Sequence, residues 1–377
     1  MLTPIAEGKE EFAIIHTLDD LGGRFIIVSD VHGCFDQLIA LLQKVNFCNT
    51  RIRAMPNLLY PNGLDDDRVY DREDVCVCVG DLVNKGPKSF DVVRFFRDIG
   101  AYVVLGNHDI KFMEVVNAIR ASVSSQRVKL PDKVRNSSMF ALAKQCPDDV
   151  LEYLQQLPHI LRLTKFKILV VHAGLDPSVS LSKQRTSAVT RMRNIMERGQ
   201  YIKLKNEFSQ IHLQQIPESR NAPSTNDYEG GTVKKNISFL EEPLSLSGSY
   251  ATLENHQFGK SWACVWGEHA SSGLNPQTYG EKINRTSDAV AIDSDLNYQG
   301  CDKKCTKRGI EVQEDVEFLP EYKGWTVVFG HDAKRKLQCY PLTFGLDTGC
   351  VYGGSLTALI LPGCTLLSVP GYKAEGK

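Results

Sequence analysis

The feature that most constrains this chain is a repeated order in which a short apolar run is followed directly by a sharp polar turn. Residues 24–29, 74–79 and 101–105 are such runs, and each turn leads into a segment with apolar residues at helical spacing. Short apolar runs bounded by turn residues are typical of buried strands. Strands that alternate with helices predict βαβ units, so we expect an α/β fold with a mainly parallel central sheet.

The other predicted elements follow from the same two periodicities. Helices are predicted where apolar residues recur about one turn apart, and these segments contain Leu38, Leu41, Leu42 and Val45, then Phe90, Val93, Phe96 and Ile99, then residues 110–123 and 149–157. Gly100 and Pro158 end two of these helices, as Gly and Pro commonly do. Further strands are predicted at 159–163, 166–171 and 326–329, and apolar runs separated by Gly over 344–369 predict closing hairpins.

Five polar clusters follow the predicted strands in order. They are Ser29-Asp30-Val31-His32-Gly33, residues 80–87 (GDLVNKGP), Gly106-Asn107-His108-Asp109, residues 171–175 (VHAGL) and Gly330-His331-Asp332. Segments that leave the carboxyl ends of strands are where ligands normally bind in α/β proteins. We therefore expect the five clusters to meet at one edge of the sheet.

The clusters offer carboxylates, an amide oxygen and several imidazoles, which together suit two divalent transition metals such as Mn, Zn or Fe. Asp30 and His32 are two residues apart and can lean to the same side of one turn. Asp81 has two carboxylate oxygens and could bridge two ions about 3.5–4 Å apart. One such cluster alone is weak, because a lone His at a strand end is more often a hydrogen-bonded structural residue. Five in this order favour a metal site.

The charge balance limits the class of partner. Lys and Arg (44) nearly equal Asp and Glu (45), so the formal net charge is −1. This argues against binding of duplex DNA or an anionic membrane through overall charge, although a local basic cleft remains compatible with it. The longest apolar stretches have the length of strands and are too short to span a bilayer.

Cysteine usage and the first residues predict a cytoplasmic protein. Residues 1–11 contain three Glu and no apolar run, unlike a secretory signal or a transit peptide. The eleven Cys form no repeating framework, and Cys76 and Cys78 lie inside a predicted strand, so buried thiols in a reducing compartment are expected. Cys301 and Cys305 could be half of a zinc site, but no second pair follows at a useful distance.

We expect a single domain over residues 1–377, with a core at about 24–370 and polar insertions near 51–72, 216–249 and 271–321. The insertions are expected to be surface loops. Trp262 and Trp266 could stack on a nucleobase, but core packing is the favoured interpretation. A basic cluster in the third insertion is either a solvated loop or a guide for a polyanion, and it comprises Lys303, Lys304, Lys307 and Arg308.

The order D-x-H, G-D-x-x, G-N-H, H-A-G and G-H resembles the calcineurin-like metallophosphoesterases, in the branch of the PPP-type Ser/Thr phosphatases and the diadenosine tetraphosphatases. The variants G-D-L-V-N-K-G-P, G-N-H-D and H-A-G-L-D-P, with the tail G-L-D-T-G-C-V-Y-G-G-S-L-T-A, look most like eukaryotic ApaH-like phosphatases. The resemblance covers roughly residues 24–362 without the insertions. It implies a central β-sandwich of mixed sheets flanked by helices.

The resemblance also implies roles for individual residues. Metal ligands are implied in two sets, Asp30, His32 and Asp81 for the first ion, and Asp81, Asn107, His172 and His331 for the second. His108 matches the family's histidine that is not a ligand and that protonates the leaving oxygen. Lys85 stands where PPP phosphatases have a phosphate-binding Arg, and Arg193 resembles another Arg that binds the oxyanion.

This chain departs from the PPP pattern beside the catalytic His. PPP enzymes have Asp at the position of Asn84, and that Asp orients the histidine. Another group is therefore expected to orient His108, either Asp109 or a backbone carbonyl. Lys85 supplies a point charge instead of the bidentate fork of an Arg.

The activity implied is metal-dependent hydrolysis of phosphoanhydrides or phosphoesters by a hydroxide that bridges two metals. The substrates implied are a dinucleoside polyphosphate or another phosphorylated small molecule, inorganic polyphosphate, or a capped RNA end. A PPP-type protein Ser/Thr phosphatase is the alternative. A non-catalytic scaffold that retains the metal fold is a more remote one.

Overall fold

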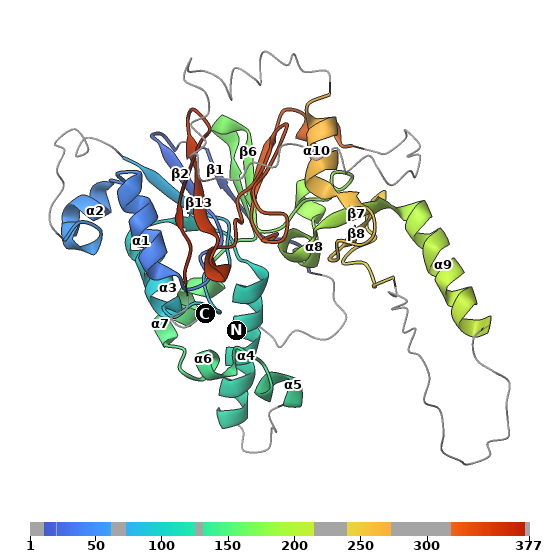
Figure 1. Ribbon diagram of the computed structural model, residues 1–377, viewed down its shortest axis with the longest axis horizontal. Helices are drawn as coiled ribbons and strands as arrows, with labels where there is room; N and C mark the ends of the chain where they lie inside the picture. The colour runs from blue at the N-terminus through green and yellow to red at the C-terminus, as the bar shows by residue number, and fades with distance from the viewer. Residues whose placement is uncertain are drawn as a thin grey trace.

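Two mixed β-sheets lie at the centre of the fold (Figure 1). The computed structural model describes residues 11–19, 21–61, 73–124, 131–214, 240–272 and 318–373. The first sheet has the strand order β1 (Ile15–Leu18), β5 (Ile160–Leu163), β6 (Ile168–Val171), β10 (Thr326–Phe329), β12 (Thr343–Gly345) and β11 (Gln338–Tyr340). The second has the order β14 (Thr365–Pro370), β13 (Ser355–Leu361), β2 (Phe25–Val28), β3 (Val75–Cys78) and β4 (Tyr102–Val103).

The sandwich of mixed sheets is confirmed, whereas the expectation of one mainly parallel sheet is wrong. Strands β2, β3 and β4 are parallel, as their alternation with helices predicts. The hairpin of β13 and β14 then adds two antiparallel strands on the other side of β2. In the first sheet β5 and β6 are antiparallel neighbours, because only a short turn joins them. The alternation of strands with helices therefore holds for only part of each sheet.

Alternate residues of the strands face different cores. Phe25 and Ile27 of β2 pack with Val328 of β10 in the layer between the two sheets. Their neighbours Ile26 and Val28 point the other way, into the core beneath the helices of the second sheet. This period of two is the ordinary geometry of a strand buried on both faces. It explains why these strands read as continuous apolar runs in the sequence.

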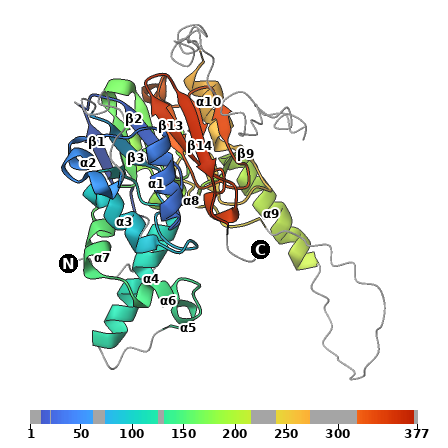
Figure 2. The same ribbon diagram turned by 60° about the vertical axis from the view of Figure 1, so that its left-hand side comes forward.

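Helices cover the outer faces of both sheets (Figures 1 and 2). The core on the outer face of the second sheet includes residues of α1 (Phe35–Lys44), α3 (Ser89–Asp98), α4 (Asn107–Ser124) and α7 (Asp148–Gln155). On the first sheet, α10 (Trp262–Ala270) and α8 (Thr186–Arg191) pack against β6 and β10. Trp262 and Trp266 are buried there, which bears out the core interpretation of both residues. None of the described helices has the length and apolar character needed to cross a membrane.

A small third sheet with the order β8 (Tyr250–Leu253), β7 (Asn194–Glu197) and β9 (Lys260–Ser261) lies beside α8 and α10 (Figure 1). From its end, α9 (Arg198–Gln214) extends away from the sheets in both ribbon views. Shorter helices are α2 (Thr50–Ala54), α5 (Asp132–Arg135) and α6 (Phe140–Lys144).

The first predicted insertion is not wholly a surface loop. Residues 51–54 belong to α2, and Ile52 and Leu59 are buried in the core beneath the helices. Burial of these apolar side chains stabilises an ordered conformation in this stretch. The Pro and Asn content of the stretch had instead suggested a surface loop. Most of the other two insertions, with Cys301, Cys305 and the basic cluster at 303–308, lies outside the described residues. The described cysteines are free thiols, as expected.

His159 joins β1 to β5 and generates a prediction about stability and pH. Its backbone N donates to Ile14 O at 2.9 Å, while its side-chain Nδ1 accepts from Ile14 N at 3.0 Å. Burial lowers the pKa of His159 from its ordinary 6.5 to about 4. Between these values the unfolded chain binds more protons than the folded chain, so the stabilisation is present above pH 6.5 and is lost as the pH falls toward 4.

We expect His159→Gln, which can still accept from Ile14 N but cannot titrate, to weaken this loss of stability in acid. The difference in unfolding free energy between pH 7 and pH 4.5 should shrink by about 1–3 kcal/mol relative to the wild type. Denaturant unfolding at several pH values measures it. The exposed His16→Gln is the control and should follow the wild type. If the unfolding free energy of wild type and His159→Gln changes equally with pH, the role of His159 in acid sensitivity is contradicted.

Candidate metal centre

The polar clusters meet at the carboxyl ends of strands from both sheets. The second sheet contributes Asp30 and His32 after β2, Asp81 after β3, and Asn107 and His108 after β4. The first sheet contributes His172 after β6 and His331 after β10. They surround a cavity of about 540 Å³ that is lined by His32, Asp81, Lys85, Asn107, His108, Arg193, His256, His331, Asp332, Ala333, Lys334, Lys336, Asp347, Gly349 and Tyr352.

The turns that carry these side chains are held in an uncommon backbone conformation. His32, Asp81, Asn84, Lys85 and His331 have φ of 48°, 54°, 74°, 68° and 67°. Left-handed conformations are unfavourable for residues with a Cβ and gather at functional sites, where the surrounding structure enforces them. Here they turn the chain back sharply after the strand and direct the side chains into the cavity.

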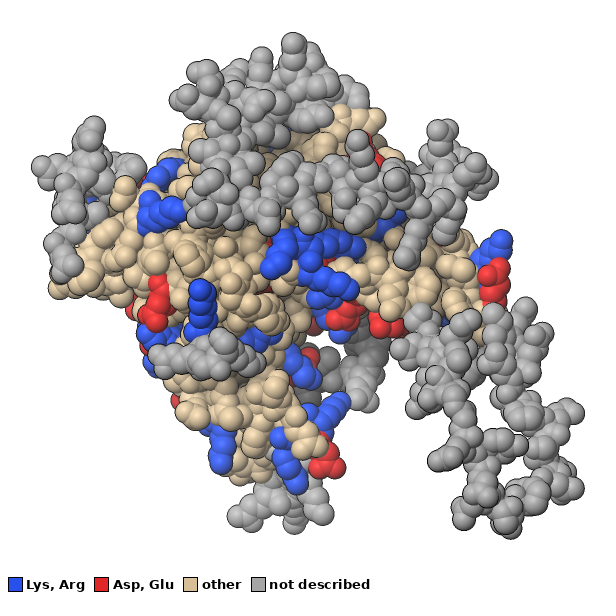
Figure 3. All heavy atoms as spheres, in the orientation of Figure 1, with Lys and Arg blue, Asp and Glu red and all other residues tan. Residues whose placement is uncertain are grey.

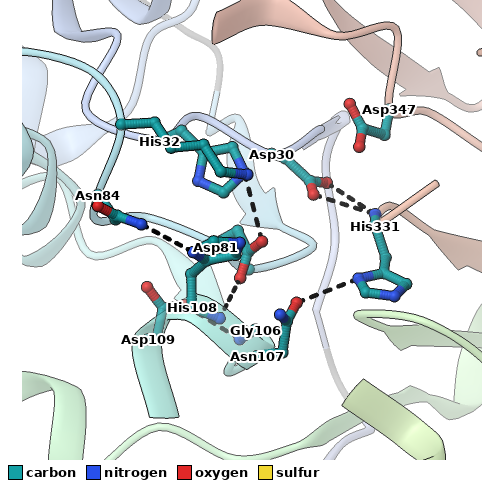
Figure 4. Close-up of polar contacts among 12 residues, drawn as sticks. Asp30, His32, Asp81, Asn84, Gly106, Asn107, His108, Asp109, His331 and Asp347 are labelled. Carbon is teal, nitrogen blue, oxygen red and sulfur yellow. Dashed lines mark hydrogen bonds and ion pairs between the residues drawn. The ribbon is translucent and has the colours of Figure 1, made fainter. Parts of the chain in front are cut away.

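Two glycines allow the carboxylates to lie against neighbouring backbone. A Cβ on Gly106 would collide with Asp81 Oδ1, and one on Gly330 would collide with Asp30 Oδ1. The close approach also permits hydrogen bonds, since His331 N donates to Asp30 Oδ1 and Oδ2 at 3.2 and 3.0 Å. Asp30 from one sheet is thereby joined to a turn of the other (Figure 4).

Asp81 lies between two histidines. Its Oδ2 is 3.4 Å from His32 Nε2, and its Oδ1 is 3.5 Å from His172 Nε2. Oδ1 also accepts from His108 N at 2.9 Å, which fixes the carboxylate (Figure 4). The two oxygens therefore face two different sides of the cavity, as a bridging ligand requires.

The second side of the cavity brings together three atoms that carry no hydrogen. His172 Nδ1 lies 2.9 Å from Val79 O, so this nitrogen is the donor and Nε2 is bare. His331 Nε2 lies 3.1 Å from Arg191 O, which likewise leaves Nδ1 bare. Both bare nitrogens face Asn107 Oδ1, at 3.0 and 3.1 Å, and the amide oxygen is also an acceptor. Lone pairs that point at one another repel unless a cation lies among them, so this arrangement is suited to a metal ion.

Burial sets the protonation of the site. It lowers the pKa of His172 to about 3 and holds the pKa of His32 and His331 well below the ordinary value. The imidazoles are therefore neutral, which is the form that binds metals. Burial raises the pKa of Asp81 to about 7, and burial followed by the charge of Asp347 raises the pKa of Asp30 well above its usual range. Carboxylates packed this closely need positive charge to stay ionised.

His108 lies beside the candidate ligands as the second residue of α4. Its ring meets that of His32 edge to face, with centroids 4.8 Å apart. Its Nδ1 contacts Asn84 Nδ2 at 3.0 Å (Figure 4), so the expectation that a residue other than Asn84 positions it is wrong. The amide is long enough to replace the carboxylate found in the PPP pattern. Burial, followed by the charge of Lys85, lowers the pKa of His108 to about 3.

Asp109 has a different function from the one considered in the sequence. Its Oδ1 accepts from Leu82 N and Val83 N at 2.8 and 3.2 Å, and its Oδ2 accepts from Gly106 N at 3.0 Å. The buried carboxylate thus holds two site loops together by backbone amides. Both of its oxygens accept from these amides, and it is Asn84 that contacts the His108 ring.

The two predicted phosphate-binding cations also line the cavity. Lys85 Nζ donates to His32 Nε2 at 2.9 Å and lies 5.1 Å from the centroid of the Tyr352 ring. Arg193 donates through Nη1 to Glu254 O at 3.0 Å, while its buried Nε has no hydrogen-bond partner among the described residues. The positive charge of Arg193 adds to the lowering of the pKa of His331 and opposes the rise that burial causes in the pKa of Asp81. The guanidinium is therefore close to the candidate ligands.

Sequence reasoning did not single out several cavity residues. Asp347 is buried and faces the carboxylates, and burial raises its pKa to about 6. It follows β12 directly, so the strand-end rule that found the other carboxylates applied here too. Lys334 and Lys336 stand on a loop without a recognisable motif, and only their place in the fold brings them to the cavity. Tyr352 belongs to the tail that carries the resemblance, but nothing in that pattern indicated that it lines the cavity.

Comparisons with known proteins agree with the resemblance seen in the sequence. The profile of the family described as calcineurin-like phosphoesterase matches residues 23–230. The symmetrical bis(5'-nucleosyl)-tetraphosphatase of Psychromonas ingrahamii is 25% identical over 335 residues, which cover 88% of this chain and 91% of that protein. The enzyme of the same name from Vibrio campbellii is 27% identical over 344 residues, covering 88% and 93%.

A solved structure matches along almost the whole chain. This crystal structure bears the provisional name diadenosine tetraphosphatase. Its sequence is 30% identical, the TM-score is 0.56, and the match covers 96% of this chain and all of the other. His331 lies beyond the residues matched by the family profile, yet the fold returns it to the same cavity.

The geometry around Asp81 generates a prediction about metal content. We expect the purified chain, loaded with Mn, Zn or Fe, to hold about two ions. Asp81→Ala should lower binding of both, because its two oxygens face both sides of the cavity. Elemental analysis and calorimetric titration with Mn²⁺ measure it, with the exposed Asp36→Ala as the control. Full metal content in Asp81→Ala would rule out the bridging position.

Proposed function

Because the chain belongs to the calcineurin-like phosphoesterases, we propose that it hydrolyses phosphoanhydride bonds with two divalent transition ions held in this cavity. By the resemblance, we assign the ions to two sets of ligands, Asp30, His32 and Asp81 in the first, and Asp81, Asn107, His172 and His331 in the second. In support, possible ligand atoms of Asp30, Asp81 and His172 lie within 4.8 Å of one another, as do those of His32, Asp81 and His108. The domain that performs the reaction spans about residues 24–370, since β13 and β14 complete the sheet that carries Asp30. The free thiols favour a reducing, cytoplasmic setting.

The observation that carries the proposal is the set of acceptor atoms that face one another without a proton. Asn107 Oδ1 meets the bare nitrogens of His172 and His331, and the oxygens of Asp81 meet the same nitrogen of His172 and that of His32. Burying such a set costs free energy unless a cation compensates it. Imidazole, carboxylate and amide oxygen together suit Mn, Zn or Fe better than Ca or Mg.

Divalent ions in such a site supply an activated water and neutralise the oxygens of the attacked phosphate. The other tasks belong to the side chains of this chain. Lys85 and Arg193 stand where they can bind oxygens of the scissile phosphate and stabilise the charge that develops on it. His108 lies where it can give a proton to the leaving oxygen, with Asn84 holding its ring.

The partner of His108 points to the kind of leaving group. Asn84 is a neutral amide and stabilises an imidazolium less than the carboxylate of the PPP pattern would. Together with burial and the charge of Lys85, this makes His108 hard to protonate. The phosphate of an anhydride leaves with little protonation, whereas a serine alkoxide depends on it. We therefore favour a dinucleoside polyphosphate as substrate. Inorganic polyphosphate and a capped RNA end contain the same phosphoanhydride bond and are the alternatives.

A panel of substrates tests this function directly. Chain loaded with Mn, Zn or Fe should hydrolyse diadenosine tetraphosphate, and polyphosphate and capped RNA are compared beside it. A chelator should abolish turnover. A preference for a phosphoserine peptide would instead establish a protein phosphatase, and metal binding without turnover of any of these or of nitrophenyl phosphate would establish a scaffold.

The position of His108 generates a prediction about leaving groups. We expect His108→Ala to retain its metal content and to lose about 10²–10⁴-fold in kcat on substrates with poor leaving groups. The loss should be smaller for nitrophenyl phosphate, whose leaving group needs little protonation. Steady-state kinetics with metal analysis measure both, and the exposed His16→Ala is the control. An equal loss for every leaving group, or loss of metal, would contradict the role of acid.

Lys85 generates a prediction about selectivity. We expect kcat/KM to be higher for a nucleotide anhydride than for a phosphoserine peptide in the wild type. Lys85→Arg should narrow this gap, because a bidentate fork favours a single terminal phosphate. Kinetics on both substrates measure the ratio, with Lys88→Arg as the matched control on a surface ion pair. A larger ratio of kcat/KM for the anhydride to kcat/KM for the peptide in Lys85→Arg would contradict this role of Lys85.

A further inference from the structure

The cavity continues from the candidate metal centre to a second group of cations. Lys334 and Lys336 line it and belong to the loop between β10 and β11 that begins with His331. Both side chains are exposed. Neither forms an ion pair with any carboxylate in the part of the chain that the structure describes. Their charges are therefore available to a ligand in the cavity.

The loop that carries the two lysines is held in place by hydrogen bonds of Arg335 and Asp332. Arg335, between them, turns inward and donates to Asp332 Oδ2 at 2.7 Å and to Asn194 Oδ1 at 2.5 Å. Asp332 is buried and also pairs with His256 Nε2 at 2.8 Å. Because this network holds the middle of the loop, the residues on either side of Arg335 are presented at fixed places.

Tyr352 lies near both Lys336 and Lys85. Lys336 Nζ is 3.6 Å from the point where a Cβ on Gly349 would lie, and Tyr352 Cδ2 is 3.8 Å from the same point. The ring centroid of Tyr352 is also 5.1 Å from Lys85 Nζ. Lys85 and Lys336 therefore both lie close to Tyr352, so that positive charge extends from beside the candidate ligands to the loop after β10.

This arrangement places more positive charge in the cavity than one phosphate requires. Lys85 and Arg193 stand beside the candidate ligands and account for the phosphate that reacts. The chain as a whole has a net charge of −1, yet Lys and Arg side chains gather near the centre of the face in Figure 3. Concentrated positive charge in a cleft attracts polyanions in particular.

We propose that Lys334 and Lys336 form a distal phosphate subsite, which binds the phosphates beyond the one attacked and selects substrates that carry a chain of them. The inference rests on the proposed function. It assigns the preference for polyphosphates to two residues that follow the candidate ligand His331 on one loop and are not themselves metal ligands. Binding at this subsite persists through the reaction, so its loss raises KM more than it lowers kcat.

The double variant K334Q/K336Q tests the subsite, because Gln keeps most of the length of the side chain without its charge. We expect the ratio of kcat/KM for diadenosine tetraphosphate to that for nitrophenyl phosphate to fall by about tenfold or more, mainly through KM. K334R/K336R should keep the ratio. The matched control is Lys323→Gln, an exposed lysine before β10 at the opposite end of that strand.

Ionic strength gives a second readout. KM for the tetraphosphate should rise with salt in the wild type and rise less in K334Q/K336Q, since the screened charges are absent there. An unchanged substrate ratio in the Gln pair, or an equal loss on both substrates, would overturn the distal subsite. If the wild type hydrolyses neither substrate in any metal, the proposed function itself fails.

Discussion

The whole arrangement depends on acceptor atoms that are buried face to face. Asp81 presents its two oxygens to bare nitrogens of His32 and His172, and Asn107 presents its amide oxygen to His172 and His331. Asp81 Oδ1 accepts from His108 N and His32 Nε2 accepts from Lys85 Nζ, but the contacts between the acceptors themselves hold no proton and are repulsive in a medium of low dielectric constant. Only a cation gives these contacts favourable energy. The fold therefore holds ligands in place before any ion arrives, which lowers the ordering cost of metal binding.

The place of the site in the sandwich makes this possible. The second sheet carries Asp30 and Asp81, while the first sheet carries His172 and His331. The backbone N of His331 donates to Asp30, so the two sheets are already joined where the ligands meet. Under the proposed function, ions held between ligands from both sheets would add a further link across the same seam. Metal binding would then be coupled to the stability of the sandwich.

The sequence predicted what depends on local patterns. Apolar runs located β2, β3, β6 and β10, and the polar turns after them supplied the candidate ligands, since strand ends meet at one edge. The pattern did not reveal that β13 inserts beside β2 as an antiparallel neighbour, because pairing between distant segments leaves no local signal. The contact of Asn84 with His108 was missed for a related reason. The comparison with the PPP pattern drew attention to the lost carboxylate, whereas an amide at the same place still reaches the ring.

The loop after β10 shows how selectivity can change while the metal core stays the same. His331 at its start faces Asn107, and Lys336 at its end lies beside Gly349 and Tyr352. Between them the ion pair of buried Asp332 with half-buried Arg335 fixes the path of the chain, independently of which residues project into the cavity. The exposed positions of this loop can therefore vary without disturbing the ligand that precedes them. Under the proposed function, a weak proton donor and the lysines of this loop, which form no ion pair with the described carboxylates, would act in the same direction, since both favour a leaving group that is itself an anionic phosphate.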